Sequence, residues 1–383
     1  MDYLLTEEQI MIRDLARQIT DEKIRPVAAE YDRTEKFPWG IMKDIAQADL
    51  FGVYIEEKYG GLGGGILELC LATEEFSKGC AGIAICYSAS ALGTYPIILA
   101  GNEEQKKKYL PSIAKGEKLA AFGLTEPAAG SDASALQTTA EKKGDHYVLN
   151  GLKHFITNGG DADIYTVIAM TDKSRGARGA SLFVVEKGTP GFTFGKKEDK
   201  MGIRASSTCE LVFNNCKIPA ENLLGREGMG FISAMRTFDM SRPGIGAQAV
   251  GIAQGALDEA IKFAKQRKQF DKPISSFQGI QWMLADMATQ TEAARALVYA
   301  SAREVGAGVK DVGVHSAMAK MYASDVAMKV TTDAVQICGG YGYMKEYPVE
   351  KYMRDAKITQ IYEGTNQIQR NIIGMGLIRE SSK

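Results

Sequence analysis

The chain has 383 residues, enough for two or three domains of ~150 residues each. Hydrophobic residues make up 45% and charged residues 24%, and the formal net charge is −1. This composition is typical of a soluble globular protein with a large core, and it creates no strong field that would attract nucleic acid or an anionic membrane. We therefore expect no nucleic-acid partner and no membrane insertion.

The six cysteines form no CxxC pair, and in a chain of this length they are expected to be buried, reduced thiols. The three histidines are scattered, so no metal site is predicted. The N-terminal segment MDYLLTEEQIMIRD has the features of neither a signal peptide nor a transit peptide. We expect a bacterial cytoplasmic protein, or the mature form of a protein of an organellar matrix.

Residues 1–118 are predicted to be helical. Thr6 with Gln9, and Asn102 with Gln105, have the spacing of capping boxes at helix N-termini. Residues 81–101 carry no charge and are close to the length that spans a membrane. Because serine, threonine, glycine and proline interrupt this stretch, a buried helix and turn is the favoured interpretation.

Residues 119–230 are predicted to form an antiparallel β domain. The segments 146–151, 163–171, 180–188 and 209–219 are rich in β-branched and aromatic residues, and Gly, Asn and Pro separate them. From residue 231 to the end the helical period returns. Glycines recur at 244–255, and because glycine weakens a helix, they indicate close approach of another helix or a ligand.

The segment GIGAQA at 244–249 matches the pattern of a dinucleotide-binding fingerprint. That fingerprint requires a preceding strand, and here the preceding residues are FDMSRP. They are predicted to begin a helix with Pro243 near its first turn. The sequence therefore does not predict a nicotinamide site.

Two motifs in the β region have more than one interpretation. The loop FGLTEPAAGSDASALQT (122–138) offers N–H groups and hydroxyls that suit a flavin or a phosphate, or it is an ordinary loop that enters a strand. In KHFITNGG (153–160), Phe155 and Thr157 would point to the same face of a strand. Such a pair suits a flat heterocycle, although core packing of Phe155 is favoured from the residue alone.

Two motifs in the C-terminal region also need explanation. In RKQFDKPISSFQ (267–278), Arg267 and Lys268 would complement the dipole at a helix C-terminus, or would reach a pyrophosphate. In IYEGTNQIQR (361–370), Glu363 stands beside a glycine in a segment that is a poor helix interior. This arrangement suits a carboxylate that meets a ligand.

Taken together, FGLTEPAAGSD, HFITNGG, RKQFDKPI, QICGGYGY and MRDAKITQIYEGTNQ, in this order, resemble the acyl-CoA dehydrogenases over essentially the whole chain. The resemblance implies an α+β fold with an N-terminal α-helical domain (1–118), a middle antiparallel β domain (119–230) and a C-terminal four-helix bundle (231–383). It also implies FAD as the cofactor and an acyl-CoA thioester as the substrate.

In this family the base lies in a YEGT-type motif, which here is Tyr362 to Thr365, so the resemblance implies Glu363 as the catalytic base. Glu363 would remove the α-proton while a hydride leaves the β-carbon for flavin N5. Hydrogen bonds from the flavin ribityl hydroxyl and the backbone N–H of the base would stabilise the thioester oxygen. Exclusion of water would raise the pKa of the base.

The family's motifs also assign binding residues. The contacts implied for FAD are Phe122, Leu124, Thr125, Gly130, Ser131, Phe155, Ile156 and Thr157, with Thr365 to Gln367 beside the base. Family tetramers share each FAD between subunits, so the contacts implied for a neighbour's FAD are Arg267, Gln269, Phe270, Gln278 and the stretch from Gln336 to Gly340, which includes Gly339. The substrate contacts implied are Ala84, Ser88, Ser131, Asp239, Arg242, Tyr362 and Gly364; for Arg242 a structural salt bridge is the alternative.

The sequence departs from the family pattern at two positions. Phe155 stands where the family often has Trp, and an aromatic face for the flavin remains. Asp271 stands where the family usually has Gly, and its carboxylate is expected to point to solvent, away from a pyrophosphate.

The acyl group is predicted from the uncharged stretch 81–101, which lines the acyl pocket in this family. The absence of a cation there argues against a dicarboxylic acyl group, and the small side chains resemble those of the short-chain, butyryl-CoA branch. A branched or alicyclic acyl group such as cyclohexanecarboxyl, and use as an enoyl-CoA reductase, remain open. So does a catalytically silent acyl-CoA-binding flavoprotein, although Glu363 argues against it. The family implies electron-transferring flavoprotein as electron acceptor and a homotetramer.

Overall fold

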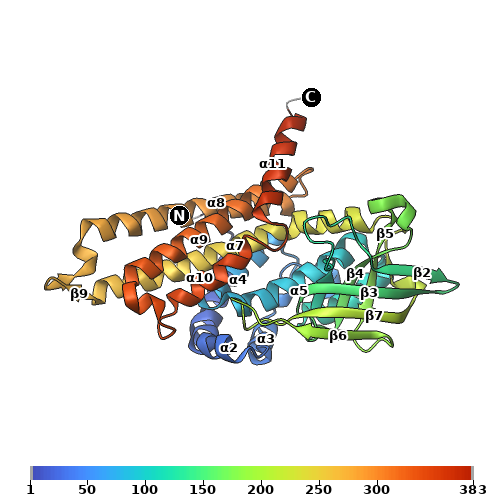
Figure 1. The fold of residues 1–383 in the computed structure, drawn as a ribbon, viewed down its shortest axis with the longest axis horizontal. Coiled ribbons are helices and arrows are strands. Elements are labelled where there is room, and N and C mark those ends of the chain that lie inside the picture. Colours follow the sequence, from blue (N-terminus) through green and yellow to red (C-terminus); the bar gives the residue numbers. More distant parts are fainter. Residues whose placement is uncertain (1–2, 381–383) are drawn as a thin grey trace.

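The computed structural model describes residues 3–380, which form helices, then a sheet, then helices again (Figure 1). The N-terminal helices are α1 (Glu7–Ile19), α2 (Ala28–Thr34), α3 (Trp39–Gln47), α4 (Ile66–Gly79), α5 (Ala81–Ala100) and α6 (Glu103–Ala114). Both predicted capping boxes are present, at Thr6 and Gln9 before α1 and at Asn102 and Gln105 before α6. The helices therefore begin where local hydrogen-bonding chemistry predicts.

Helix α5 is long and apolar enough to cross a membrane, and it is the only such helix between residues 3 and 380. Most of it is nevertheless buried in the fold, between α4, α7 and the sheet. The prediction of a buried helix is confirmed. The predicted turn is wrong, because the helix continues through Pro96 to Ala100.

The middle part is one sheet in the strand order β6-β7-β3-β2-β4-β5-β8, with β1 beside β4. Its strands are β1 (Ala120–Gly123), β2 (Thr139–Lys143), β3 (His146–Thr157), β4 (Ile164–Met170), β5 (Ala180–Glu186), β6 (Phe192–Lys197), β7 (Thr208–Pro219) and β8 (Leu223–Leu224). All four predicted strand segments lie on strands, and most neighbours pair antiparallel. The exceptions are β1 and the first residue of β2, Thr139, which pair parallel with β4.

The C-terminal part is built around one long helix. Its elements are α7 (Gly230–Gln266), the hairpin of β9 (Lys268–Gln269) and β10 (Lys272–Pro273), α8 (Gln278–Gly306), α9 (Gly313–Cys338), α10 (Val349–Thr359) and α11 (Asn366–Glu380). Helix α7 packs against α8, α9 and α10 and also against α4 and α5 of the N-terminal part. At Gly251 an added Cβ would lie 2.3 Å from the Glu74 carbonyl oxygen of α4, so the recurrent glycines do allow a close helix approach.

The predicted helix start at FDMSRP is wrong, because α7 begins at Gly230 and Pro243 lies inside it. Proline lacks an N–H, which leaves the carbonyl four residues earlier, that of Asp239, without its helical donor. The Ser316 hydroxyl of α9 donates to this carbonyl at 2.8 Å. A partner from another helix thus replaces the lost hydrogen bond, and GIGAQA lies within the same helix with no strand before it.

Helix α10 joins the three parts of the chain through its MRDAK segment. Arg354 forms an ion pair with Asp32 of α2 at 2.7 Å and donates to the Met201 carbonyl oxygen at 3.0 Å. Asp355 is fully buried, accepts a hydrogen bond from the Ile203 N–H at 2.6 Å and pairs with Lys351 at 2.5 Å. These contacts fix the middle part against the helices close to the turn that follows α10.

Replacing Asp355 with Ala is expected to lower the free energy of unfolding by about 3–5 kcal/mol, because Lys351 would remain buried without its partner. The measurement is the thermal unfolding midpoint of the variant. Asp333→Ala is the control, since its pair with Lys329 is exposed and worth only about 0–1 kcal/mol. Equal thermal unfolding midpoints for the two variants would contradict the stabilising role assigned to the buried pair of Lys351 and Asp355.

Candidate active site

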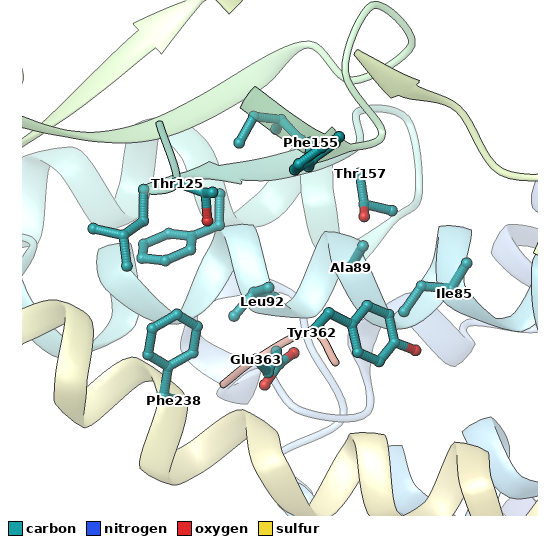
Figure 2. A pocket seen from close by; sticks show the side chains of 12 residues that line it. Ile85, Ala89, Leu92, Thr125, Phe155, Thr157, Phe238, Tyr362 and Glu363 are labelled. Carbon is teal, nitrogen blue, oxygen red and sulfur yellow. The ribbon is translucent and has the colours of Figure 1, made fainter. Parts of the chain in front are cut away.

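An apolar cavity of about 110 Å³ lies where the sheet meets the helices (Figure 2). Helix α5 provides one wall through Ile85, Ala89 and Leu92, which share one helix face. Phe238 of α7 lines another side. The residues of the cavity that the sequence predicted as site residues are Phe122, Leu124, Thr125, Phe155, Ile156, Thr157, Tyr362 and Glu363.

Glu363 lies in the turn between α10 and α11, on the side of the cavity opposite Phe155 and Thr157 (Figure 2). Its φ is +50° and that of Gly364 is +89°, so two successive residues have left-handed backbone. Glycine adopts this conformation freely, whereas for glutamate it costs about 1–2 kcal/mol. The Gln369 side chain donates to the carbonyl oxygens of both residues, at 3.1 Å and 2.9 Å.

The environment of Glu363 raises its pKa to about 7. Burial is the main cause, because it disfavours the charged carboxylate. Three groups oppose this rise: the Ser241 hydroxyl donates to Glu363 Oε2 at 2.5 Å, and the cations Arg242 and Lys320 lie nearby. The carboxyl group can therefore both lose and gain a proton near neutral pH.

Phe155 lies in a β-bulge of β3, where the pairing with β7 shifts between Lys153 and Ile156. Its φ is +58°, and its side chain is 62% exposed and packs against the His154 ring at a centroid distance of 3.9 Å. The prediction that Phe155 packs in the protein core is therefore wrong. Phe155 and Thr157 do face the same cavity, as predicted. Regular strand alternation is not the reason, because the bulge brings Ile156 to the cavity as well.

A second cavity, of about 490 Å³, lies at the other end of α7 and α9, close to the β9–β10 hairpin. This hairpin is at the end of the molecule away from the sheet (Figure 1). Of the residues implied for a neighbour's FAD, Arg267, Gln269, Gly339 and Gly340 line this cavity. Gln278 and Gln336 are exposed near it but do not line it.

The hairpin turns at Phe270 and Asp271, whose φ values are +50° and +63°. Glycine fits this backbone conformation best, which explains in physical terms why a glycine would suit position 271. Asp271 is exposed, as predicted, and Phe270 is 87% exposed at the tip.

Several predicted site residues lie outside the first cavity. Ala84 and Ser88 are buried but do not line it, because the face of α5 toward the cavity carries Ile85, Ala89 and Leu92. The helical spacing of these three residues was the signal that could have identified them. Gly130 and Ser131 are exposed in the loop between β1 and β2.

Arg242 and Asp239 form an ion pair at 2.8 Å, which is the structural alternative considered for Arg242. Arg242 is 4% exposed, and burial lowers its pKa; its Nε has no hydrogen-bond partner among residues 3–380.

The residues after Gly364 differ in orientation. The Thr365 hydroxyl accepts the Ile368 N–H at 3.3 Å at the start of α11, and Gln367 is exposed. Asn366 was expected to contact the cofactor, but its side chain is buried against α9. Ser241, Lys320 and Gln369 also contact or hold the turn, and no sequence motif distinguished them.

The side chains present fit FAD. An exposed aromatic ring and the Thr125 and Thr157 side chains face one cavity (Figure 2), and they suit a flat heterocycle with polar edges. The second cavity combines Arg267 with Gly339 and Gly340, where an added Cβ would meet no atom within 4 Å. A cation beside open backbone suits a pyrophosphate. Among residues 3–380, no group of three or more His, Cys, Asp or Glu side chains could hold a metal.

Three family models cover most of the chain. The acyl-CoA dehydrogenase N-terminal domain matches residues 6–117, the middle domain residues 121–216 and the C-terminal domain residues 228–378. The chain belongs to the acyl-CoA dehydrogenase family. The α–β–α fold predicted from the sequence is confirmed by these matches and by the structure.

Two relatives illustrate the range of this family. The short-chain specific acyl-CoA dehydrogenase of Clostridium acetobutylicum is 50% identical over 380 residues, which cover 99% of this chain and 100% of the relative. The acryloyl-CoA reductase (NADH) of Anaerotignum propionicum is also 50% identical, over 381 residues that cover 99% of this chain and 96% of the relative.

Three solved structures share the fold. Butyryl-CoA dehydrogenase from Megasphaera elsdenii has a TM-score of 0.96 and 52% identity, over 99% of this chain and 100% of that one. A chain from work on the electron transferring flavoprotein of Acidaminococcus fermentans and flavin-based electron bifurcation has a TM-score of 0.97 and 53% identity, with the same coverage. An acyl-CoA dehydrogenase complexed with FAD from Bacillus anthracis has a TM-score of 0.93 and 37% identity, over 100% of this chain and 68% of that one.

Replacing Ser241 with Ala is expected to raise the pKa of Glu363 by about one unit, because the lost hydrogen bond favours the charged carboxylate. The carboxyl titration can be followed by infrared difference spectroscopy and assigned by its loss in Glu363→Gln. Ser233→Ala, on the same helix, is the control and should leave the titration unchanged. A pKa that stays constant or falls in Ser241→Ala would contradict the contact.

Proposed function

We propose that this FAD-dependent acyl-CoA dehydrogenase acts on short-chain, butyryl-like acyl-CoA thioesters and that Glu363 is its catalytic base. The single observation that carries the proposal is a half-buried carboxyl group with a pKa raised to about 7 that faces an apolar cavity. Bound FAD supplies the acceptor for the hydride that leaves the β-carbon. The product is the 2-enoyl-CoA.

The role of Glu363 follows from its protonation chemistry. A carboxylate with an ordinary pKa near 4.3 is a weak base toward an α-C–H group. Burial makes Glu363 a stronger base, and with a pKa of about 7 it is still ionised in part of the molecules at neutral pH. The backbone N–H of Glu363 is proposed to donate to the thioester oxygen, where negative charge develops as the proton leaves.

The remaining site residues are proposed to bind and orient. Phe155, Thr125 and Thr157 would contact the flavin, and Arg267 with Gly339 and Gly340 would contact the FAD of a neighbouring subunit. Thr365 and Gln367 stay predictions as cofactor contacts. So do Gly130 and Ser131, whose loop is exposed. For the substrate, Arg242 stays a prediction as a contact, and Gly364 gives the backbone beside the base its left-handed conformation.

The lining of the cavity supports a short, uncharged acyl group. Its side walls carry Ile85, Leu92 and Phe238, and no cation among residues 3–380 lines it, which disfavours a dicarboxylic acyl group. A branched or alicyclic group such as cyclohexanecarboxyl would need a wider space with the same base.

A second candidate function is enoyl-CoA reduction in the cell. The relative named acryloyl-CoA reductase (NADH), at 50% identity, favours it. The same carboxyl group would then deliver a proton to the α-carbon, which its pKa of about 7 allows. A silent acyl-CoA-binding flavoprotein is disfavoured, because the carboxyl group is present and aimed at the cavity.

We further propose a homotetramer that exchanges electrons with an electron-transferring flavoprotein. The related chain from Acidaminococcus fermentans supports this electron partner. The two cavities at opposite ends of α7 support sharing of FAD between subunits, and α11 projects from the body with Met375 and Leu377 exposed (Figure 1). A bacterial cytoplasmic location remains a prediction.

The test is an anaerobic titration of the FAD-loaded protein with butyryl-CoA, cyclohexanecarboxyl-CoA and octanoyl-CoA, with the flavin absorbance band as readout. We expect butyryl-CoA to bleach the band fastest. Glu363→Gln should bind the same thioester and bleach about 10²–10⁴-fold more slowly. Bleaching by Glu363→Gln at the wild-type rate would refute the assigned base, and bleaching by octanoyl-CoA alone would refute the short-chain assignment.

The bleaching rate should also depend on pH. Because the carboxylate is the active form, the rate should rise as pH increases through about 7, the pKa of Glu363. The measurement is the second-order rate constant of bleaching at low butyryl-CoA concentrations, which reports the free enzyme, between pH 5.5 and 8.5, about 1.5 units on either side of that pKa. A rate that falls over this range would contradict a carboxylate base.

A further inference from the structure

A fully buried lysine of α9, Lys320, contacts the turn that carries Glu363. Its Nζ donates to the Gly364 carbonyl oxygen at 2.8 Å and to Asn366 Oδ1 at 2.9 Å. Burying an ammonium group is costly unless acceptors satisfy it, and here both acceptors belong to the turn and the first residue of α11. The lysine therefore connects the rigid helix α9 to the segment beside the base.

Asn366 extends this connection along the same face of α9. Its Nδ2 donates to Asp325 Oδ1 at 2.7 Å and to Ser324 Oγ at 2.8 Å. The Gln360 side chain, at the end of α10, donates to the same Asp325 oxygen at 2.7 Å. Residues on both sides of Glu363 are thus tied to one stretch of α9.

These hydrogen bonds explain how the turn keeps its left-handed backbone conformation. Glu363 and Gly364 are both left-handed, and a left-handed glutamate persists only where its surroundings impose it. Gln369 holds the two carbonyl oxygens from within α11. Lys320 bonds one of these carbonyl oxygens, that of Gly364, to a different helix, α9.

We propose that Lys320 is a positioning residue, which holds the left-handed turn so that the Glu363 carboxylate stays aimed into the cavity. This inference rests on the role proposed for Glu363. Lys320 does not line the cavity, so it acts through the turn and not on the thioester.

The charges around the turn support a second effect of Lys320. Arg242 on α7 and Lys320 both lower the pKa of Glu363, Asp239 pairs with Arg242, and Asp325 faces Lys320. Burial lowers the pKa of Lys320 itself to about 7. Removal of its charge should therefore raise the pKa of Glu363 and move the rise of rate with pH to higher pH.

The test compares Lys320→Met with Lys351→Met in the FAD-loaded protein. Lys351 is a buried lysine of α10 that pairs with Asp355 and does not contact the turn, so it controls for the general loss of a buried lysine. The first readout is amide hydrogen exchange in residues 361–369, which is independent of the reaction. The second is the limiting rate of flavin bleaching by butyryl-CoA as a function of pH.

For Lys320→Met we expect faster exchange at Asn366 and Gln369, whose N–H groups bond to the Gln360 and Thr365 carbonyl oxygens. The limiting rate should fall about 10–100-fold with little change in butyryl-CoA affinity. Lys351→Met should lower the thermal unfolding midpoint without these effects. The proposal would be overturned if Lys320→Met matched Lys351→Met in amide hydrogen exchange, in the limiting bleaching rate and in the dependence of that rate on pH.

If Lys320→Met does not fold, Asn366→Ala provides the same test. This variant removes the side-chain hydrogen bonds of Asn366 to α9 and leaves Lys320 in place. The expected changes have the same direction, and wild-type exchange and rate in Asn366→Ala would overturn the proposal. Glu363→Gln separates the two hypotheses. If it bleaches at the wild-type rate, the assigned base fails, while the exchange data still decide whether Lys320 holds the turn.

Discussion

The site depends on the partial burial of one carboxyl group, that of Glu363. Glu363 lies between α7, α5 and the sheet, where loss of water raises its pKa to about 7. Desolvation alone would favour a permanently neutral acid. The Ser241 hydroxyl and the two cations, Arg242 and Lys320, oppose it and keep the charged form accessible. The strength of the base therefore follows from a balance between the loss of water, which raises the pKa, and one hydrogen bond with two nearby cations, which lower it.

The rest of the fold keeps Glu363 and the groups around it in position. Helix α10 joins the N-terminal helices to the loop before β7 through Arg354 and Asp355, and it ends four residues before Glu363. The helix that connects the parts of the chain therefore also leads into the turn that presents the base. On the opposite wall, the bulge in β3 turns the Phe155 ring out of the protein core and toward the cavity. Both functional walls rely on local left-handed backbone that the surrounding structure imposes.

Features encoded by neighbouring residues were predictable from the sequence. The capping box at Thr6 and the four β segments follow from local hydrogen bonding and side-chain preference. Features that depend on contacts between residues far apart in the sequence were not predictable. Pro243 lies inside a helix because Ser316, far along the chain, replaces the missing donor. The orientation of Phe155 depends on a bulge that strand periodicity does not encode, and the contacts of Lys320 exist only once α9 meets the turn.

The most direct test of the account is exchange of the α-hydrogens of acetyl-CoA with deuterium oxide in the presence of the FAD-loaded protein. Acetyl-CoA has α-hydrogens but no β-carbon, so the measurement isolates proton removal from oxidation. The account predicts exchange whose rate rises with pH through about 7 and falls about 10²–10⁴-fold in Glu363→Gln. Equal exchange by the wild type and by Glu363→Gln would contradict it.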